Sequence, residues 1–100
     1  MTKTQYFLNL LQEECAELAQ RASKAMRFEL HEVQEGQTFN NEQRLIAEYI
    51  DLLGVISMLE EEGIIQKVPF NVLEAGVEAK KAKIRKYFDY SLARGQVRLY

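Results

Sequence analysis

The sequence predicts an all-α protein, a helical bundle of three main helices per chain that is completed by a symmetric partner chain. Three long segments repeat apolar residues at intervals of three and four, and no segment shows the alternation that is typical of a β-strand. Gly36, Gly63 and Pro69 mark the connections between these segments. One hundred residues suffice for one domain with a modest core, so we expect a single helical domain over residues 1–100.

The first helix is expected over about residues 3–31. Thr2 followed by Gln5 has the sequence of a capping box, in which each side chain binds the backbone of the other residue. Apolar residues then form one stripe: Phe7, Leu8, Leu11, Cys15, Leu18, Ala22, Ala25 and Met26. Residues 32–41 combine glycine, threonine and paired asparagines without a helical period, which predicts a loop.

The second helix is expected over about residues 41–62, with Asn40 and Gln43 as its cap and Gly63 as its stop. Its side chains are apolar around nearly the whole circumference, which is typical of a helix that is covered on every side. Two further helices cannot cover it alone. We therefore expect a homodimer.

The third helix is expected over about residues 71–92, and residues 93–100 form a tail. Asn71 and Glu74 supply the predicted cap, and Gly95 ends the helix. Its apolar stripe consists of Phe70, Leu73, Val77, Ile84 and Phe88.

The net charge of −2 conceals an asymmetry along the chain. Residues 1–66 hold 12 acidic and 5 basic residues (−7), whereas residues 67–100 hold 3 acidic and 8 basic residues (+5). The basic segment is short and the pI is about 5.5, so we expect no nucleic-acid partner. No stretch favours membrane insertion, the N-terminus lacks the features of a signal peptide, and Cys15 is the only cysteine. We expect a cytoplasmic protein.

Two carboxylates interrupt the most apolar segment, which runs from Arg44 to Leu59. Glu48 and Asp51 lie three residues apart, which places them only about 60° apart around a helix. Carboxylates are seldom buried without a partner, because desolvating an unpaired charge is costly. A cation is therefore expected beside them.

A second acidic group lies on the first helix. The helical period turns Glu14 and Glu17 inward and Glu13 toward solvent, although such a cluster taken alone is usually a solvated face. Four convergent carboxylates would repel one another unless a cation offset them, and oxygen ligands favour Mg²⁺, with Mn²⁺ as the alternative. A di-iron bundle requires Glu-x-x-His pairs, and the single histidine, His31, has no such spacing.

Lys80, Lys83 and Tyr87 share one flank of the third helix. A flank of lysines near a metal site could neutralise a triphosphate, so these three are candidate phosphate-binding residues. The alternative is a solvated basic helix end that interacts favourably with the helix dipole.

The pattern Glu13-Glu14-x-x-Glu17 followed by Glu48-x-x-Asp51 resembles the EExxE…ExxD signature of the MazG-like all-α nucleoside triphosphate pyrophosphohydrolases. The resemblance covers about residues 8–92, and the short chain is similar to compact members that phages often carry. One departure is the spacer of 30 residues between Glu17 and Glu48, slightly longer than in many members.

The resemblance implies a hydrolase of phosphoanhydride bonds that converts an NTP or dNTP to NMP and pyrophosphate. It implies Mg²⁺ binding by Glu14, Glu17, Glu48 and Asp51, with Glu17 and Glu48 as catalytic residues and Glu17 orienting the attacking water. The expected assembly is a homodimer or a dimer of dimers. Two alternatives remain: a phosphoribosyl-ATP pyrophosphohydrolase, and a non-catalytic helical protein that binds nucleotide or mediates interactions.

Overall fold

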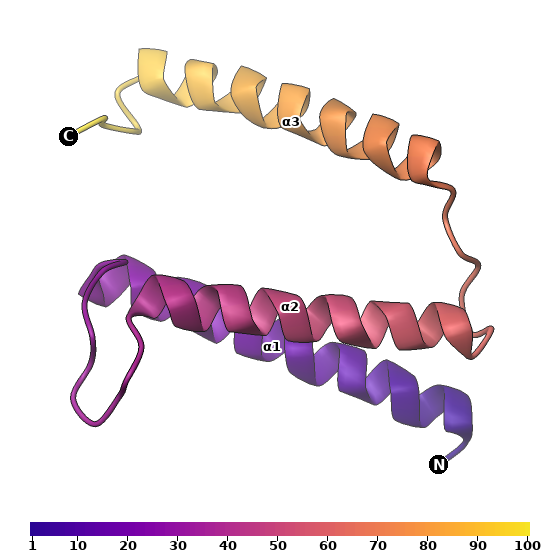
Figure 1. Cartoon of the computed structure of the whole chain (residues 1–100). Helices are drawn as coiled ribbons and strands as arrows, with labels where there is room; N and C mark the ends of the chain where they lie inside the picture. The colour runs from indigo at the N-terminus through magenta and orange to yellow at the C-terminus, as the bar shows by residue number, and fades with distance from the viewer. The chain divides into compact units, whose positions relative to one another are not determined.

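The protein consists of three α-helices and no β-strand, in a computed structural model that describes residues 1–100 (Figure 1). The helices are α1 (Lys3–Phe28), α2 (Asn41–Glu61) and α3 (Phe70–Ala93). The all-α prediction with three helices is thus confirmed. The chain divides into two compact units, Met1–Gln66 with α1 and α2, and Lys67–Tyr100 with α3. None of the helices combines the length and the apolar character that crossing a membrane would require.

The predicted caps of α1 and α2 are both present. The Gln5 backbone N–H donates to Thr2 Oγ1 at 3.1 Å, and the Thr2 backbone N–H donates to Gln5 Oε1 at 2.9 Å. Asn40 and Gln43 form the same reciprocal pair, with distances of 2.8 and 2.9 Å. Each box satisfies amide groups that have no partner inside the helix, so the starts of both helices are fixed locally.

Two other helix ends differ from the sequence prediction. Helix α1 ends at Phe28, short of His31, because Glu29 adopts a φ of 80° and turns the backbone out of the helix. Helix α3 begins at Phe70, and its N-cap is Pro69, without a side-chain hydrogen bond. The predicted cap by Asn71 and Glu74 is wrong, because Pro69, with φ of −57°, already turns the chain into the helix and both residues lie inside it.

The connection between α1 and α2 is tied to the start of α2 by backbone carbonyls. The buried side chain of Asn41, 2% exposed, donates from Nδ2 to the Glu29 carbonyl at 2.7 Å. The backbone amides of Asn41 and Glu42 donate to the carbonyls of Glu32 at 3.1 Å and Leu30 at 2.9 Å. The loop thus satisfies the first amides of α2 and holds the helix end against the end of α1.

Helix α2 ends in a Schellman motif. The Ile64 amide donates to the Leu59 carbonyl at 2.9 Å, and the Gly63 amide donates to the Glu60 carbonyl at 3.0 Å. Gly63 has a φ of 70°, which a residue without a Cβ adopts at little cost. An ion pair between Lys3 and Glu62 then joins the start of α1 to the end of α2.

Helices α1 and α2 pack as an antiparallel hairpin (Figure 1). The least exposed residues of α1 form one stripe, here called the α1 inner stripe: Phe7, Leu10, Leu11, Glu14, Leu18, Arg21, Lys24 and Ala25. The least exposed residues beyond the first turn of α2 form the α2 inner stripe: Leu45, Glu48, Leu52, Val55, Ile56, Leu59 and Glu60. Contrary to the predicted stripe, Leu8, Cys15, Ala22 and Met26 are exposed.

The single chain leaves much of its apolar surface in solvent. Only Ala25 and Leu59 are buried apolar residues. The side of α2 formed by Ile46, Tyr49, Ile50 and Leu53, here called the α2 outer stripe, is between 46% and 58% exposed. Helix α3 has no buried residue, so its stripe from Phe70 to Phe88 is also exposed. Apolar patches of this kind usually mark an interaction surface.

Candidate metal centre

Three carboxylates of the first unit meet between α1 and α2. One carboxylate oxygen from each of Glu14, Glu17 and Glu48 lies within 4.8 Å of the other two. Glu14 and Glu17 come together because they lie three positions apart on one helix, and Glu48 lies in the α2 inner stripe. These residues, here called the acidic triad, are three of the four predicted metal ligands.

Two oxygens of the acidic triad are shielded from solvent and have no hydrogen-bond partner, Glu14 Oε2 and Glu48 Oε2. Both residues are half-buried, whereas Glu17 is exposed. A shielded carboxylate oxygen without a donor is destabilising, and native proteins rarely retain one without a compensating group. A set of carboxylate oxygens is the ligand type that hard divalent cations prefer. The chemistry of the acidic triad therefore fits Mg²⁺ or Mn²⁺.

The electrostatics show the same crowding of negative charge. Burial raises the pKa of Glu14 above its ordinary value, and the charges of Glu17 and Asp51 raise it further, although a hydrogen bond with Glu48 opposes them. The pKa of Glu17 is raised first by a hydrogen bond to Glu48, which forms when Glu17 carries the proton, and then by repulsion between the two carboxylates. A cation that replaces this proton would relieve the repulsion.

Asp51, the fourth predicted ligand, lies next to the acidic triad and is exposed. Its charge contributes to the raised pKa of both Glu14 and Glu17. Asp51 and Glu14 line one open groove of about 560 Å³ on the flank of the hairpin. The other lining residues are apolar: Phe7, Leu10, Ile50, Gly54, Val55 and Met58. Asp51 and Glu14 thus line the same groove, whereas Asp51 lies outside the set of oxygens that converge in the acidic triad.

Glu13 behaves as predicted for a residue that faces solvent. It is exposed and accepts a hydrogen bond from Asn9 Nδ2 at 3.5 Å. It lies outside the acidic triad. Because it has the same side chain on the same helix, Glu13 is a matched control for substitutions in the triad.

The predicted phosphate-binding residues Lys80, Lys83 and Tyr87 lie on α3, in the second unit, and all three are exposed. Neither lysine takes part in an ion pair, whereas the adjacent Lys81 pairs with Glu78 at 3.0 Å. Their action on a phosphate group stays a prediction.

Arg21 is a charged residue of the α1 inner stripe that the motif spacing did not single out. Its Nη1 atom is shielded from solvent and has no hydrogen-bond partner. The signal that could have found it is its position seven residues after Glu14, which is two helical turns along the same face.

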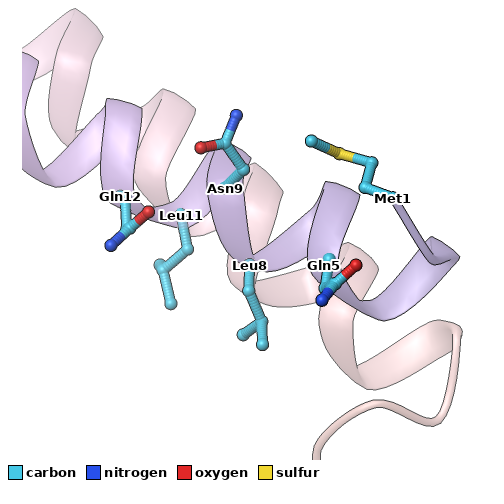
Figure 2. A pocket seen from close by; sticks show the side chains of 6 residues that line it. All are labelled: Met1, Gln5, Leu8, Asn9, Leu11 and Gln12. Atoms are coloured by element: carbon cyan, nitrogen blue, oxygen red, sulfur yellow. The ribbon is translucent and has the colours of Figure 1, made fainter.

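A further concave surface lies on the N-terminal half of α1 (Figure 2). Leu8 and Leu11 project side by side there, next to the amides of Gln5 and Gln12. The surface encloses about 650 Å³, and Met1 and Asn9 complete its lining. It contains no carboxylate, imidazole or thiol, so it offers no group for acid–base or metal chemistry.

The fold and the site together define an all-α protein of three helices with a largely accessible acidic triad that could hold a divalent cation. No protein-family model, curated protein or solved structure matches the chain. The resemblance to the MazG-like enzymes therefore rests on the spacing of the acidic motifs in the sequence.

Proposed function

We propose that this protein is a Mg²⁺-dependent pyrophosphohydrolase that converts an NTP or dNTP to NMP and pyrophosphate. The observation that carries the proposal is the convergence of Glu14, Glu17 and Glu48 within 4.8 Å, together with the two shielded carboxylate oxygens that have no partner. The residues that converge belong to both of the spaced acidic motifs. A solvated acidic face would not place one of its members on the inner stripe of a second helix.

Glu14, Glu17 and Glu48 would hold the cation, and Asp51 would complete the set from the neighbouring groove. When bound, Mg²⁺ offsets the negative charge of the phosphate groups, so that catalysis depends mainly on positioning and charge neutralisation. The half-buried Glu14 and Glu48 are fixed by helix packing. The groove lined by Glu14 and Asp51 is the proposed route of the substrate to the site.

Glu17 is the candidate for orienting the attacking water. It is the exposed member of the acidic triad, and its pKa is raised by the hydrogen bond to Glu48 and by repulsion from that residue. Glu48 would support this role from the α2 inner stripe, where it would hold the cation next to Glu17.

A second copy of the chain is the proposed partner, in a dimer or a dimer of dimers. The α2 outer stripe and the stripe of α3 leave apolar side chains in solvent along both helices, and the two buried apolar residues make a very small core. Lys80, Lys83 and Tyr87 are the proposed phosphate-binding residues of the second unit.

The test is incubation with Mg²⁺ and a panel of NTPs and dNTPs, with pyrophosphate, NMP and orthophosphate quantified separately. Glu48→Gln removes one acid of the triad, and Glu13→Gln is the matched control. The proposal expects pyrophosphate and NMP from the wild type and from Glu13→Gln, and none from Glu48→Gln. Orthophosphate release that depends on Glu48 would show that the cleaved bond is a different one.

No turnover of any nucleotide would refute the proposal. In that case phosphoribosyl-ATP is the next substrate to examine. If the protein does not hydrolyse that compound either, the non-catalytic alternative is favoured.

A further inference from the structure

Arg21 is half-buried on the face of α1 that packs against α2, and one atom of its charged group, Nη1, has no hydrogen-bond acceptor. It lies on the α1 inner stripe between Leu18 and Ala25, and its Nη1 is shielded from solvent. A guanidinium group carries five N–H donors and no acceptor, so each shielded N–H requires an oxygen from another group. Leaving such a donor unpaired is destabilising, and more so for a charged group.

Carboxylates that could pair with Arg21 are near in the sequence. Glu17 precedes it by four residues on the same helix, which is the favourable arrangement for an acid and a base. The ion pairs Lys3–Glu62 and Lys81–Glu78 nevertheless do not include Arg21, and its Nη1 has no hydrogen-bond partner. Arg21 is therefore not the counter-ion of the acidic triad.

Arg44 provides a comparison within the same hairpin. It is half-buried and lies four residues before Glu48 on α2. Its Nη1 donates to Gln34 Oε1 at 3.3 Å, so this guanidinium already has a partner in the loop. Arg21, in contrast, has a shielded N–H group without a hydrogen-bond partner.

The position of Arg21 relative to the triad follows from helix geometry. It is rotated by only about 20° from Glu14 around α1, and it lies about 6 Å along the axis from Glu17. The acids and the arginine therefore occupy one side of α1. An anion held at the triad through a cation would have further oxygens within about one helical turn of the guanidinium.

We propose that Arg21 binds a phosphate group of the substrate, next to the phosphate oxygens that the cation holds at the acidic triad. This inference rests on the proposed function. The planar fork of the guanidinium matches two phosphate oxygens at once, and Mg²⁺ sites commonly share their ligands with phosphate. The phosphate chain would then extend from the triad toward the loop end of the hairpin, and Arg21 would be a substrate-binding residue.

The experiment measures the affinity for inorganic pyrophosphate in Mg²⁺ by calorimetry and the KM and kcat for the preferred nucleotide. Arg21→Met removes the charge, Arg21→Lys retains it without the fork, and Arg98→Met makes the same change at an exposed arginine of the tail. Arg21→Met should weaken pyrophosphate binding and raise KM by roughly ten- to a hundredfold, the loss expected for hydrogen bonds of a charged group. The KM and the pyrophosphate affinity of Arg21→Lys should lie between those of the wild type and Arg21→Met. Arg98→Met should have the same KM and affinity as the wild type.

The outcomes separate this inference from the proposed function. If the wild type is active and Arg21→Met changes neither KM nor the affinity for pyrophosphate, the role of Arg21 is overturned. The proposed function is not affected by that result. The role of Arg21 would also be overturned if Arg21→Met changed the oligomeric state or the melting temperature but not the affinity for pyrophosphate. That result would indicate that Arg21 forms an ion pair with a carboxylate of a second copy. If Arg21→Met does not fold, an Arg21→Lys variant with wild-type KM and affinity would also overturn the inference.

If the wild type binds pyrophosphate in Mg²⁺ but hydrolyses no nucleotide, the proposed function is refuted. The pyrophosphate affinities of the variants still test the role of Arg21. Wild type that binds neither pyrophosphate nor nucleotide would overturn both.

Discussion

Magnesium should stabilise this protein strongly, and Glu48→Gln should remove most of that effect. The acidic triad brings three carboxylates within 4.8 Å, and two of their oxygens are shielded without a partner. Without a cation the folded chain retains this repulsion, which unfolding would relieve. Glu48→Gln removes the carboxylate that faces both acids of α1, so the metal-free variant should melt at a higher temperature than the metal-free wild type.

The size of the effect follows from linkage between binding and folding. A ligand at 100 times its Kd stabilises the folded state by about 2.7 kcal/mol, which corresponds to a rise in Tm of roughly 10–20 °C for a domain of this size. If the loss of one carboxylate weakens Mg²⁺ binding by about a hundredfold, the same Mg²⁺ concentration contributes only about 0.4 kcal/mol, or roughly 2–3 °C.

The assay is thermal melting followed by far-UV circular dichroism, in EDTA and in a series of Mg²⁺ concentrations at constant ionic strength. Glu13→Gln is the control, because Glu13 is exposed, lies outside the triad and makes the same type of charge change. The charge of Glu13 also raises the pKa of Glu14 and Glu17, so the Mg²⁺ shift of Glu13→Gln should be slightly smaller than that of the wild type and much larger than that of Glu48→Gln. Equal shifts for the wild type and Glu48→Gln would refute a shared cation site, as would an unshifted wild type.

Three further predictions concern pH, the loop and assembly. Because the pKa of Glu17 lies above its ordinary value of 4.5, the folded state binds this proton more tightly than the unfolded state. Metal-free protein should therefore lose stability as the pH rises from about 4.5 through the raised pKa. In EDTA, Glu17→Gln should reduce the fall of the melting temperature with rising pH. A difference in melting temperature between this variant and the wild type that is the same at every pH would contradict the reasoning. Asn41→Ala should cost about 1–3 kcal/mol in chemical denaturation, because the Glu29 carbonyl loses its donor, whereas Asn71→Ala should be nearly neutral; equal losses would contradict the assignment. Leu53→Lys should convert an oligomer to a monomer in light scattering, and a monomeric wild type would contradict the proposed assembly.

The ends of the helices were predictable wherever a local signal decides them. Thr2 and Asn40 form the capping boxes that their spacing with Gln5 and Gln43 indicates, and Gly63 ends α2 through a left-handed turn. The start of α3 was not predictable in this way. Asn71 and Glu74 have the spacing of a cap, but the turn at Pro69 already starts the helix before them. A cap motif shows which residues could cap a helix, and the conformation of the preceding backbone determines whether they do.

The acidic triad was predictable for a similar reason, since Glu14, Glu17 and Glu48 lie at helical intervals within or beside apolar stripes. The offset of Asp51 was not predictable, because it depends on how α1 crosses α2. The same crossing shields the guanidinium of Arg21, and shielding of one side-chain atom leaves no pattern in a sequence.

The Asn41 hydrogen bond to the loop also sets the rotational phase of α2. Asn41 and Glu48 are seven residues apart, nearly two full turns, so the side chain that anchors the helix and the carboxylate of the triad lie within about 20° of each other. A residue inserted between them would rotate Glu48 by about 100° away from α1 while leaving the composition of the site intact. Residues added near Gly36, within the loop, would leave that phase unchanged. The spacing from Asn41 to Glu48 therefore constrains the site more tightly than the spacing from Glu17 to Glu48.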